Sequence, residues 1–403
     1  MYIESTNKVN HKAIILVLAM LTAFAPFATD MYLPGFAAMA ETLNTSTPSL
    51  QLSLSIFFLG LAVGQLLYGP ISDRWGRKTP VITGIAIFFI ASVLIMFTTN
   101  YELFIVLRFI QSIGGAAGMV MSRVIIQDLF DQKQSAQALS TMMVMQGIGP
   151  VLAPISGGFL ISHFAWQSVF LLLSVFSFFC LYTTLRYIPE TLVYNERKNI
   201  SVNDIARQFI NILKVKAFLI PCLISSLAVS VMFTFIAASP DLFMKIYQLN
   251  ETQYGFAFGV IACGIVVFSQ INRLLLSRYT LTQILKMSMI FSVIFSVLLM
   301  LSLSSSSLIY TMIPLFFCVG MVPLIAANST ALAMSAFPKN AGPASSLVGI
   351  MQFGMGFIFS SLPGLFGNNN TIVMGIVIVG CFNLSLMLFS LLSSAVNYTH
   401  KFK

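Results

Sequence analysis

Residues 79–98 read TPVITGIAIFFIASVLIMFT, a run of about 20 residues that contains no charged side chain. As an α-helix, such a run is long enough to cross the roughly 30 Å hydrocarbon core of a bilayer, and its backbone hydrogen bonds stay within the helix. A strand of a membrane barrel would alternate apolar and polar residues, whereas this run is apolar on every side. The stretch therefore predicts a transmembrane helix.

Similar runs recur along the whole chain of 403 residues, of which 58% are hydrophobic and 8% are charged. A soluble domain carries roughly 25% charged residues, so the composition excludes that class. We predict an all-α integral membrane protein with twelve transmembrane helices. The expected helices span residues 13–34, 49–70, 79–98, 102–124, 135–162, 166–188, 217–240, 253–276, 283–304, 307–335, 342–365 and 371–396.

The basic residues predict the orientation of these helices. All but two of the 21 Lys and Arg residues fall in the terminal segments and in loops on one side, the exceptions being Lys245 and Arg108. Cytoplasmic loops carry such an excess, so we expect both termini in the cytoplasm. The same distribution accounts for the net charge of +9 without a nucleic-acid partner. The first helix contains Pro26, Asp30 and Pro34 and is expected to be retained, not cleaved as a signal peptide.

Weak internal similarity predicts two six-helix bundles, residues 1–188 and 217–403. Residues 140–146 resemble residues 346–352, and two further matches, Pro34 with Pro240 and Gln65 with Gln270, lie at nearly the same spacing. Such a duplication suggests two halves around a central site, the architecture of secondary transporters. We therefore expect a complete pathway within one chain, and a monomer.

The cytoplasmic linker between the bundles, residues 189–216, is the most polar part of the chain. Ile205, Phe209 and Ile212 recur in it at helical spacing. This pattern favours an amphipathic helix on the inner membrane face, with a plain connecting tether as the alternative.

The residue types argue against an enzyme. The five cysteines have no metal-site spacing and are interpreted as small buried hydrophobes. The three histidines fall in loops or at chain ends, no phosphate-binding glycine loop is present, and we expect neither metal nor cofactor. The cysteines are Cys180, Cys222, Cys263, Cys318 and Cys381, and the histidines are His11, His163 and His400.

Asp30 and Arg108 are expected at membrane depth, where a charged side chain marks a functional site by default. Burial disfavours an ionised carboxylate, as a site that exchanges protons near neutral pH requires. Alternatively, Asp30 fixes a kink at Pro34, which cannot donate to the carbonyl of residue 30. Arg108 keeps its proton and needs either a water-filled cavity or a partner, which could be a carboxylate, an anionic substrate or backbone carbonyls.

Two motifs combine charge with small residues. Residues 69–78, GPISDRWGRK, form a short loop in which Gly76 permits a tight turn. Asp73 would be favoured beside a neighbouring helix start such as Gly342-Pro343, although a simple positive-inside anchor is the alternative. Residues 147–158, GIGPVLAPISGG, predict a helix that packs closely and bends, as a hinge or seal between the halves.

Together these motifs resemble the major facilitator superfamily over nearly the whole chain. Residues 73–78 resemble its loop signature, residues 108–111 the helix 4 signature of proton-coupled members, and residues 150–158 the helix 5 signature of antiporters. Residues 30–34 and 337–346 resemble the Bcr/CflA drug-resistance subgroup, whose substrates include bicyclomycin- and chloramphenicol-type compounds.

The resemblance implies a role for each motif and a bacterial inner-membrane location. Asp30 and Arg108 would take part in proton coupling, and since Thr22 and Phe24 stand where some exporters have a second acid, we predict one proton per cycle. The loop would lock one conformation through Gly69, Asp73, Arg74, Gly76, Arg77 and Lys78. The antiporter motif would comprise Gly149, Pro150, Pro154, Gly157 and Gly158.

A cavity for amphipathic molecules would be apolar with a few polar anchors. We predict that Gln111, Gln146, Asn328 and Gln352 are the anchors and that Tyr32, Phe233 and Phe235 form the walls, with interhelical bonding or packing as the alternative for each. The expected function is secondary active export of such compounds in exchange for protons. Export of an endogenous metabolite or siderophore is the alternative.

Overall fold

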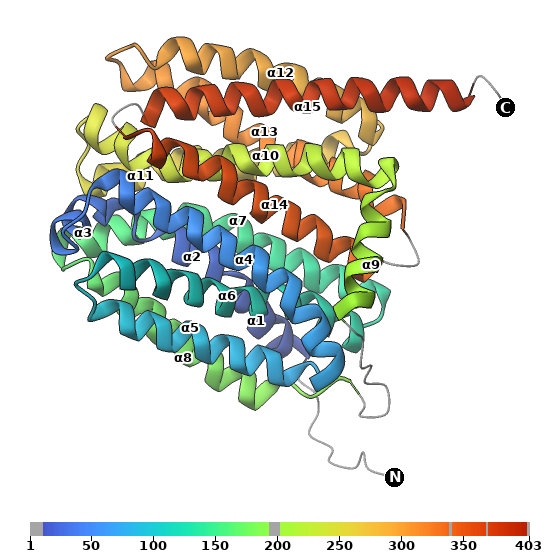
Figure 1. Ribbon diagram of the computed structural model, residues 1–403, viewed down its shortest axis with the longest axis horizontal. Coiled ribbons are helices and arrows are strands. Elements are labelled where there is room, and N and C mark those ends of the chain that lie inside the picture. The colour runs from blue at the N-terminus through green and yellow to red at the C-terminus, as the bar shows by residue number, and fades with distance from the viewer. Residues whose placement is uncertain (1–10, 193–201, 338–340, 368–369, 401–403) are drawn as a thin grey trace.

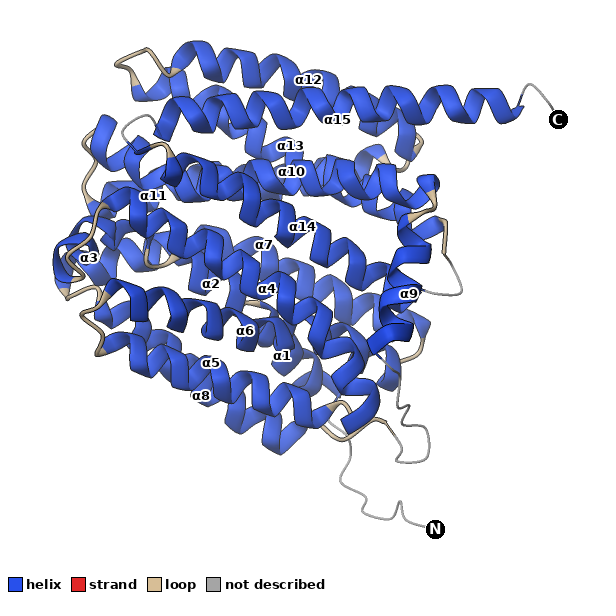
Figure 2. Ribbon diagram, in the orientation of Figure 1, coloured by secondary structure: helices blue, strands red, loops and turns tan. Residues whose placement is uncertain are grey.

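The computed structural model describes residues 11–192, 202–337, 341–367 and 370–400, and in these ranges its regular elements are all helices (Figure 2). Within these ranges, twelve spans are long and apolar enough to cross a membrane, which confirms the predicted number. The elements are α1 (His11–Thr22), α2 (Phe24–Asp30), η1 (Leu33–Gly35), α3 (Phe36–Thr42), α4 (Thr47–Trp75), α5 (Lys78–Met96), α6 (Tyr101–Leu129), α7 (Gln132–His163), α8 (Gln167–Tyr187), α9 (Val202–Leu213), α10 (Lys216–Pro240), η3 (Asp241–Ile246), α11 (Glu251–Leu275), α12 (Leu281–Ser302), α13 (Leu308–Ser335), α14 (Ala341–Leu365) and α15 (Asn370–His400).

The first span is broken, whereas the sequence predicted one helix over residues 13–34. It runs from His11 to Thr42 as α1, α2, η1 and α3. Pro34 has no N–H with which to continue the helix from the carbonyl of Asp30. The chain instead tightens into the 3₁₀ turn η1, where the Gly35 N–H donates to the Tyr32 carbonyl at 3.0 Å. The break therefore places Asp30 at the end of a helix.

The helices form two groups, which we call the N-half (α1–α8) and the C-half (α10–η3–α15). The halves meet along two seams: α4 packs against α10 and α14, and α7 packs against α11. Figure 1 shows α3 at one end of the molecule and α9 at the other, and we refer to these as the α3 end and the α9 end. The α4 seam thus runs from one end of the molecule to the other.

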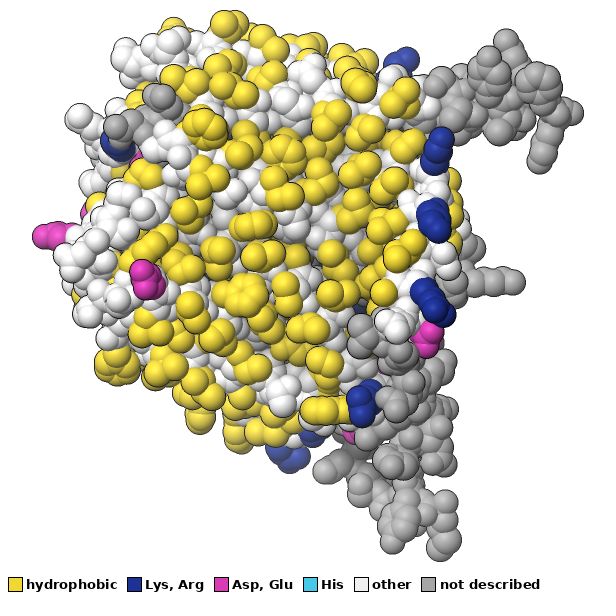
Figure 3. All heavy atoms as spheres, in the orientation of Figure 1, with side chains coloured by type: hydrophobic (Ala, Val, Ile, Leu, Met, Phe, Trp, Pro, Cys, Tyr) yellow, Lys and Arg dark blue, Asp and Glu magenta, His cyan; other side chains and the backbone are white. Residues whose placement is uncertain are grey.

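The outer surface matches a lipid environment. Hydrophobic side chains cover the middle of the face shown in Figure 3, and basic side chains gather along the α9 end. Leu94 and Ile376 are examples of large apolar side chains that are about half exposed. Cys263 is exposed as well, so the prediction that every cysteine is buried is wrong at this position, because its side of α11 faces outward; the other four cysteines are buried.

Helix α9 forms within the predicted linker, but its apolar side packs on protein. Ile212 is 3% exposed and lies in a cluster with Phe218 of α10 and Leu347 of α14. Phe209 packs against the same cluster, and Ile205 is half-buried. Contacts with the C-half therefore hold α9 in place.

Candidate functional site

Asp30 is buried where the first span breaks, with 1% of its surface exposed. It is the last residue of α2, and its Oδ1 atom has no hydrogen-bond partner among the described residues. A buried carboxyl oxygen without a partner is costly in its charged form and is rare in folded proteins. The site is therefore suited to a carboxyl group that takes up and releases a proton.

Arg108 of α6 lies fully buried beside this break. Its Nη2 donates to the Ala28 carbonyl at 2.9 Å, and its Nη1 donates to Gln111 Oε1 at 2.6 Å. Its guanidinium carbon lies 4.4 Å from the ring centroids of both Tyr32 and Phe57, a distance at which cation–π attraction acts. Arg108 thus ties α6 to the backbone of α2.

No ion pair within 4 Å joins Arg108 to a carboxylate in the described part of the chain. Of the partners that the sequence left open for Arg108, the structure shows the backbone carbonyl. The Ala28 carbonyl can accept this bond because α2 ends two residues later, at Asp30. The break in the first span therefore supplies the acceptor that a buried guanidinium needs.

Two of the predicted substrate residues belong to this cluster. The Tyr32 hydroxyl hydrogen-bonds to Ser53 Oγ at 2.8 Å, and Gln111 Nε2 donates to Ser92 Oγ at 2.7 Å. The structure therefore brings Asp30, Arg108, Tyr32 and Gln111 together. Both ends of the Gln111 amide are occupied by protein groups.

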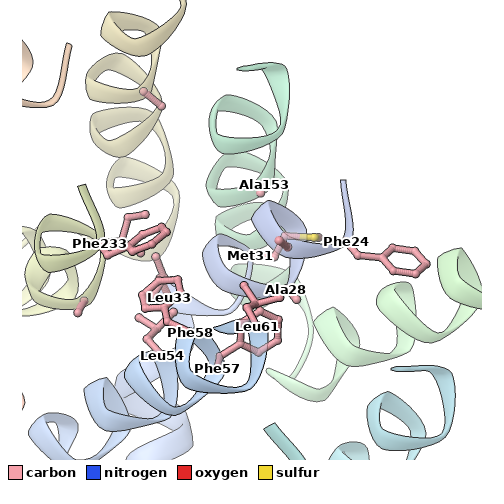
Figure 4. Close-up of a cluster of buried hydrophobic side chains, with 14 of the residues drawn as sticks. Phe24, Ala28, Met31, Leu33, Leu54, Phe57, Phe58, Leu61, Ala153 and Phe233 are labelled. Atoms are coloured by element: carbon pink, nitrogen blue, oxygen red, sulfur yellow. The ribbon is translucent and has the colours of Figure 1, made fainter. Parts of the chain in front are cut away.

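The other predicted substrate residues lie elsewhere. Phe233 stacks on Phe58 across the α4 seam, with ring centroids 3.9 Å apart, and Figure 4 shows the two rings facing one another. The remaining four sit on helix contacts or are half-buried. Phe235 stacks on Phe258, Gln352 donates to Ser225 Oγ at 2.7 Å, Asn328 donates to Asn272 Oδ1 at 2.7 Å, and Gln146 is half-buried on α7.

Helix α7 packs closely against the break in the first span. A Cβ atom at Gly157 would overlap the Met31 carbonyl oxygen, and one at Gly149 would lie 2.9 Å from Pro26 Cγ. Only glycine allows so close an approach of two backbones. The predicted bend does not interrupt the helix, which is continuous through Pro150 and Pro154.

The same helix forms the second seam. A Cβ atom at Gly158 would overlap the Glu251 carbonyl oxygen of α11, and one at Gly255 would lie 2.6 Å from the Pro154 carbonyl oxygen. Close packing of small residues is how membrane helices associate tightly. Helix α7 therefore contacts both the Asp30 break and the opposite half of the molecule.

The sequence predicted a loop over residues 69–78, but α4 continues to Trp75 and α5 begins at Lys78, because the apolar run of α4 continues in helical form through Pro70. The turn is confined to Gly76 and Arg77, and the φ of 93° at Gly76 disfavours any residue with a side chain. Arg77 makes three side-chain hydrogen bonds in this segment. Its Nη1 donates to Asp73 Oδ1 at 2.6 Å and to Ser72 Oγ at 2.8 Å. Its Nε donates to Asp128 Oδ2 at 3.2 Å. Arg74 is exposed. A Cβ atom at Gly69 would meet Ser346 Oγ of α14 at 3.9 Å, so this part of α4 lies beside the second turn of α14, while the predicted contact of Asp73 with the start of that helix stays a prediction.

Two acids in this region were missed by sequence reasoning. Asp128, at the end of α6, also accepts from Thr191 Oγ1 at 2.8 Å. The Glu190 carboxylate accepts the backbone N–H groups of Arg77 (2.7 Å) and Lys78 (3.3 Å) at the start of α5, where the helix dipole favours an anion. The loop therefore links α4, α5, α6 and the segment that follows α8.

Five residues of α4 contact the C-half in a row along one face of that helix, because they recur at intervals of three or four residues or their multiples. We call this row of contacts the α4 ladder and each contact a rung. Gln51, which begins the ladder at the α3 end, bonds to Asp241, a second buried acid that the sequence analysis did not single out. Hydrogen bonds, a ring stack and close contacts follow it toward the α9 end. The pairs are Gln51–Asp241 (3.0 Å), Ser55–Ser360 (2.8 Å), Phe58–Phe233 (3.9 Å between ring centroids), Gln65–Gly349 and Gly69–Ser346.

Comparisons with known proteins cover nearly the whole chain. The family model described as Major Facilitator Superfamily matches residues 18–361. The bicyclomycin resistance protein homolog of Haemophilus influenzae is 29% identical over 381 residues, 94% of this chain and 96% of that protein. The multidrug resistance protein MdtL of Citrobacter koseri is 30% identical over 386 residues, 94% of this chain and 95% of that protein. A crystal structure of a D-xylose-proton symporter shares the fold, with a TM-score of 0.76 at 14% identity over 93% of this chain and 97% of that one.

Proposed function

Because this chain belongs to the major facilitator superfamily, we propose that it exports small amphipathic organic compounds in exchange for protons. The chain is a multi-pass membrane transporter, not an enzyme. Its likeness to proteins named for bicyclomycin and multidrug resistance extends over nearly their full length and supports drugs as the cargo. Asp30 carries the proposal of proton exchange, because it is a buried acid with an oxygen that lacks a partner among the described residues.

The residues around Asp30 have distinct roles in this proposal. Asp30 takes up the proton, and Arg108 holds the Ala28 carbonyl and thereby the shape of the break. Tyr32 supports Arg108 from one side and is fixed by Ser53. The remaining predicted anchors and walls would reach cargo only when the halves separate; they are Gln146, Phe233, Phe235, Asn328 and Gln352. Substrate and proton would then compete, because each would bind to the same conformation of the protein around Asp30.

The placement in the membrane is part of the same proposal. The basic side chains gather at the α9 end, so this end would face the cytoplasm of a bacterium with the protein in its inner membrane. Both termini would then be cytoplasmic. The two halves would act as two six-helix bundles within a monomer, joined by the linker that contains α9.

The test is expression in an efflux-deficient bacterium, followed by transport with purified protein in vesicles. We expect resistance to bicyclomycin- or chloramphenicol-type compounds and, in vesicles with an imposed pH gradient, drug movement accompanied by opposite proton flux read with a pH-sensitive dye. Drug movement without proton flux would contradict antiport. Absence of resistance to any compound would instead favour export of an endogenous metabolite.

Arg77→Ala should lower the initial transport rate about tenfold, because losing hydrogen bonds worth about 1–2 kcal/mol shifts a conformational equilibrium by about that factor. Arg74→Ala is the matched control: the resemblance also assigned Arg74 to the lock, but its side chain is exposed in the last turn of α4. It should leave the rate within about twofold. Equal losses in the two variants would show that the loop acts through its charge alone.

A further inference from the structure

Asp241 is a buried acid on the boundary between the halves. It is 5% exposed, lies at the start of η3 immediately after Pro240, and accepts a hydrogen bond from Gln51 Nε2 at 3.0 Å. Gln51 belongs to the N-half and Asp241 to the C-half. Their bond is the rung of the α4 ladder nearest the α3 end, so any separation of the halves at that end must break it.

The Gln51 side chain has an unused acceptor. It is 0% exposed, and its Oε1 atom is buried without a hydrogen-bond partner in the described part of the chain. A carboxylate only accepts hydrogen bonds, whereas a protonated carboxyl also donates one. A neutral acid facing a primary amide can therefore make two hydrogen bonds with it, where the ionised acid makes one.

We propose that Asp241 is a second proton-binding carboxyl, and that its protonation closes the α3 end by adding a hydrogen bond from the carboxyl to Gln51 Oε1. The proton comes from water at the α3 end and converts the carboxylate to the acid, with no other bond made or broken. Closure removes Asp241 from water, which penalises the ionised form and favours the protonated one. Closure and proton binding are thus linked, each favouring the other.

Charged and titratable groups near η3 are few. Helix α11, which packs against η3, contributes Glu251 and Tyr254. Lys245 lies on η3 itself, and Tyr247 directly follows it. Tyr254 bonds to Ser239 at 2.7 Å and Tyr247 to Thr311 at 2.6 Å, while Lys245 is exposed. The described turns of α4, α10, α14 and α15 at the α3 end carry no acidic or basic residue. Among the described titratable groups named here, Asp241 is therefore the buried acid that bonds across the two halves.

The proton on Asp241 gates the transporter and is not itself carried across. It binds as the α3 end closes and returns to the same side when that end opens, so it does not add to the one proton per cycle predicted for Asp30. This inference rests on the proposed function only in assuming that the two sides of the membrane differ in proton concentration. A distance measurement tests it without any transported compound, so it can fail while transport through Asp30 stands.

The experiment measures the separation of the halves at the α3 end by pulsed electron spin resonance. Spin labels are attached at Glu102→Cys and Ser306→Cys, two exposed positions at this end in opposite halves, after replacement of the native cysteines. Between about pH 8 and about pH 5 the closed population of the otherwise unaltered protein should rise, by at most about tenfold in the closed-to-open ratio per pH unit for one proton. Asp241→Asn, which is neutral and can donate, should stay closed with little pH dependence.

Three further variants separate this rung from its surroundings. Gln51→Leu should weaken the pH dependence, because it removes the acceptor. Ser360→Ala breaks the neighbouring rung without changing a titratable group, so it should open the α3 end equally at every pH. Asp30→Asn should retain the pH-dependent closure. The inference is overturned if the Asp241→Asn variant closes with the same pH dependence as the unaltered protein, or if that protein shows none.

Discussion

Asp30→Asn should reduce drug-driven proton flux to the level of empty vesicles and remove the resistance that the unaltered protein confers. Asparagine has nearly the same shape but cannot bind and release a proton at this site. Asp30 is 1% exposed, and no other described acid of the N-half is buried, so none is placed to bind the proton in its stead. The measurement is dye-detected proton flux in vesicles, with protein amount matched between variants.

The fold should tolerate this substitution. Arg108 makes no ion pair with Asp30 and keeps its bonds to Ala28 and Gln111 when the acid is gone. Removing a buried carboxylate leaves no unpaired partner charge behind, so the thermal unfolding midpoint in detergent should change little. Glu102→Gln is the control, an exposed acid in the first turn of α6, and it should transport normally. Full proton flux in Asp30→Asn would place proton coupling at another residue.

Gly157→Ala should cost about 1–3 kcal/mol and eliminate most transport, although it adds a single methyl group. Its Cβ would lie 2.7 Å from the carbonyl carbon of Met31 and even closer to the oxygen. Both contacting groups are backbone, so no side chain can rotate away, and either α7 or the break beside Asp30 must move. We expect the thermal unfolding midpoint to fall by several degrees, measured in the same detergent.

Gly147→Ala provides the matched control on the same helix. Its Cβ would meet only Val266 Cγ2, at 3.7 Å, an ordinary contact distance. Alanine favours the helix by up to about 1 kcal/mol over glycine, so this variant should be as stable as the unaltered protein or more so. If both variants lost stability and transport to the same extent, general flexibility of α7, and not its contact with Met31, would be the property that matters.

The sequence predicted the spans well because a membrane helix is specified by length and hydropathy within one segment. It also identified Asp30 and Arg108, since charge at membrane depth is rare. It could not identify their partners. The bond from Arg108 to the Ala28 carbonyl exists only because the helix breaks two residues later, and the sequence predicted a continuous helix there. The role of Arg108 depends on that local geometry.

Partners distant in sequence explain most of what was missed. Asp241 was overlooked because the predicted helix ended at residue 240 and because its partner Gln51 is 190 positions away. Asp128 and Glu190 looked like ordinary charges near helix ends, and only folding brings both to Arg77. No periodicity within a segment encodes such contacts. The predicted drug-binding residues remain a prediction, since most of them make helix–helix contacts in this structure.

The ladder on α4 gives this helix the mechanics of a lever. From Gln51 to Gly69 it extends over about 27 Å at 1.5 Å per residue, with directional hydrogen bonds toward the α3 end and contacts between side chains and glycines toward the α9 end. Between them, the stacked rings of Phe58 and Phe233 have no hydrogen bond to lose when they slide or tilt, so they form the natural fulcrum. When one arm of a stiff rod swings out, the other presses inward. In the proposed transport cycle, opening of one end would therefore tighten the other, and the stiffness of α4 would help to prevent a continuous leak across the membrane.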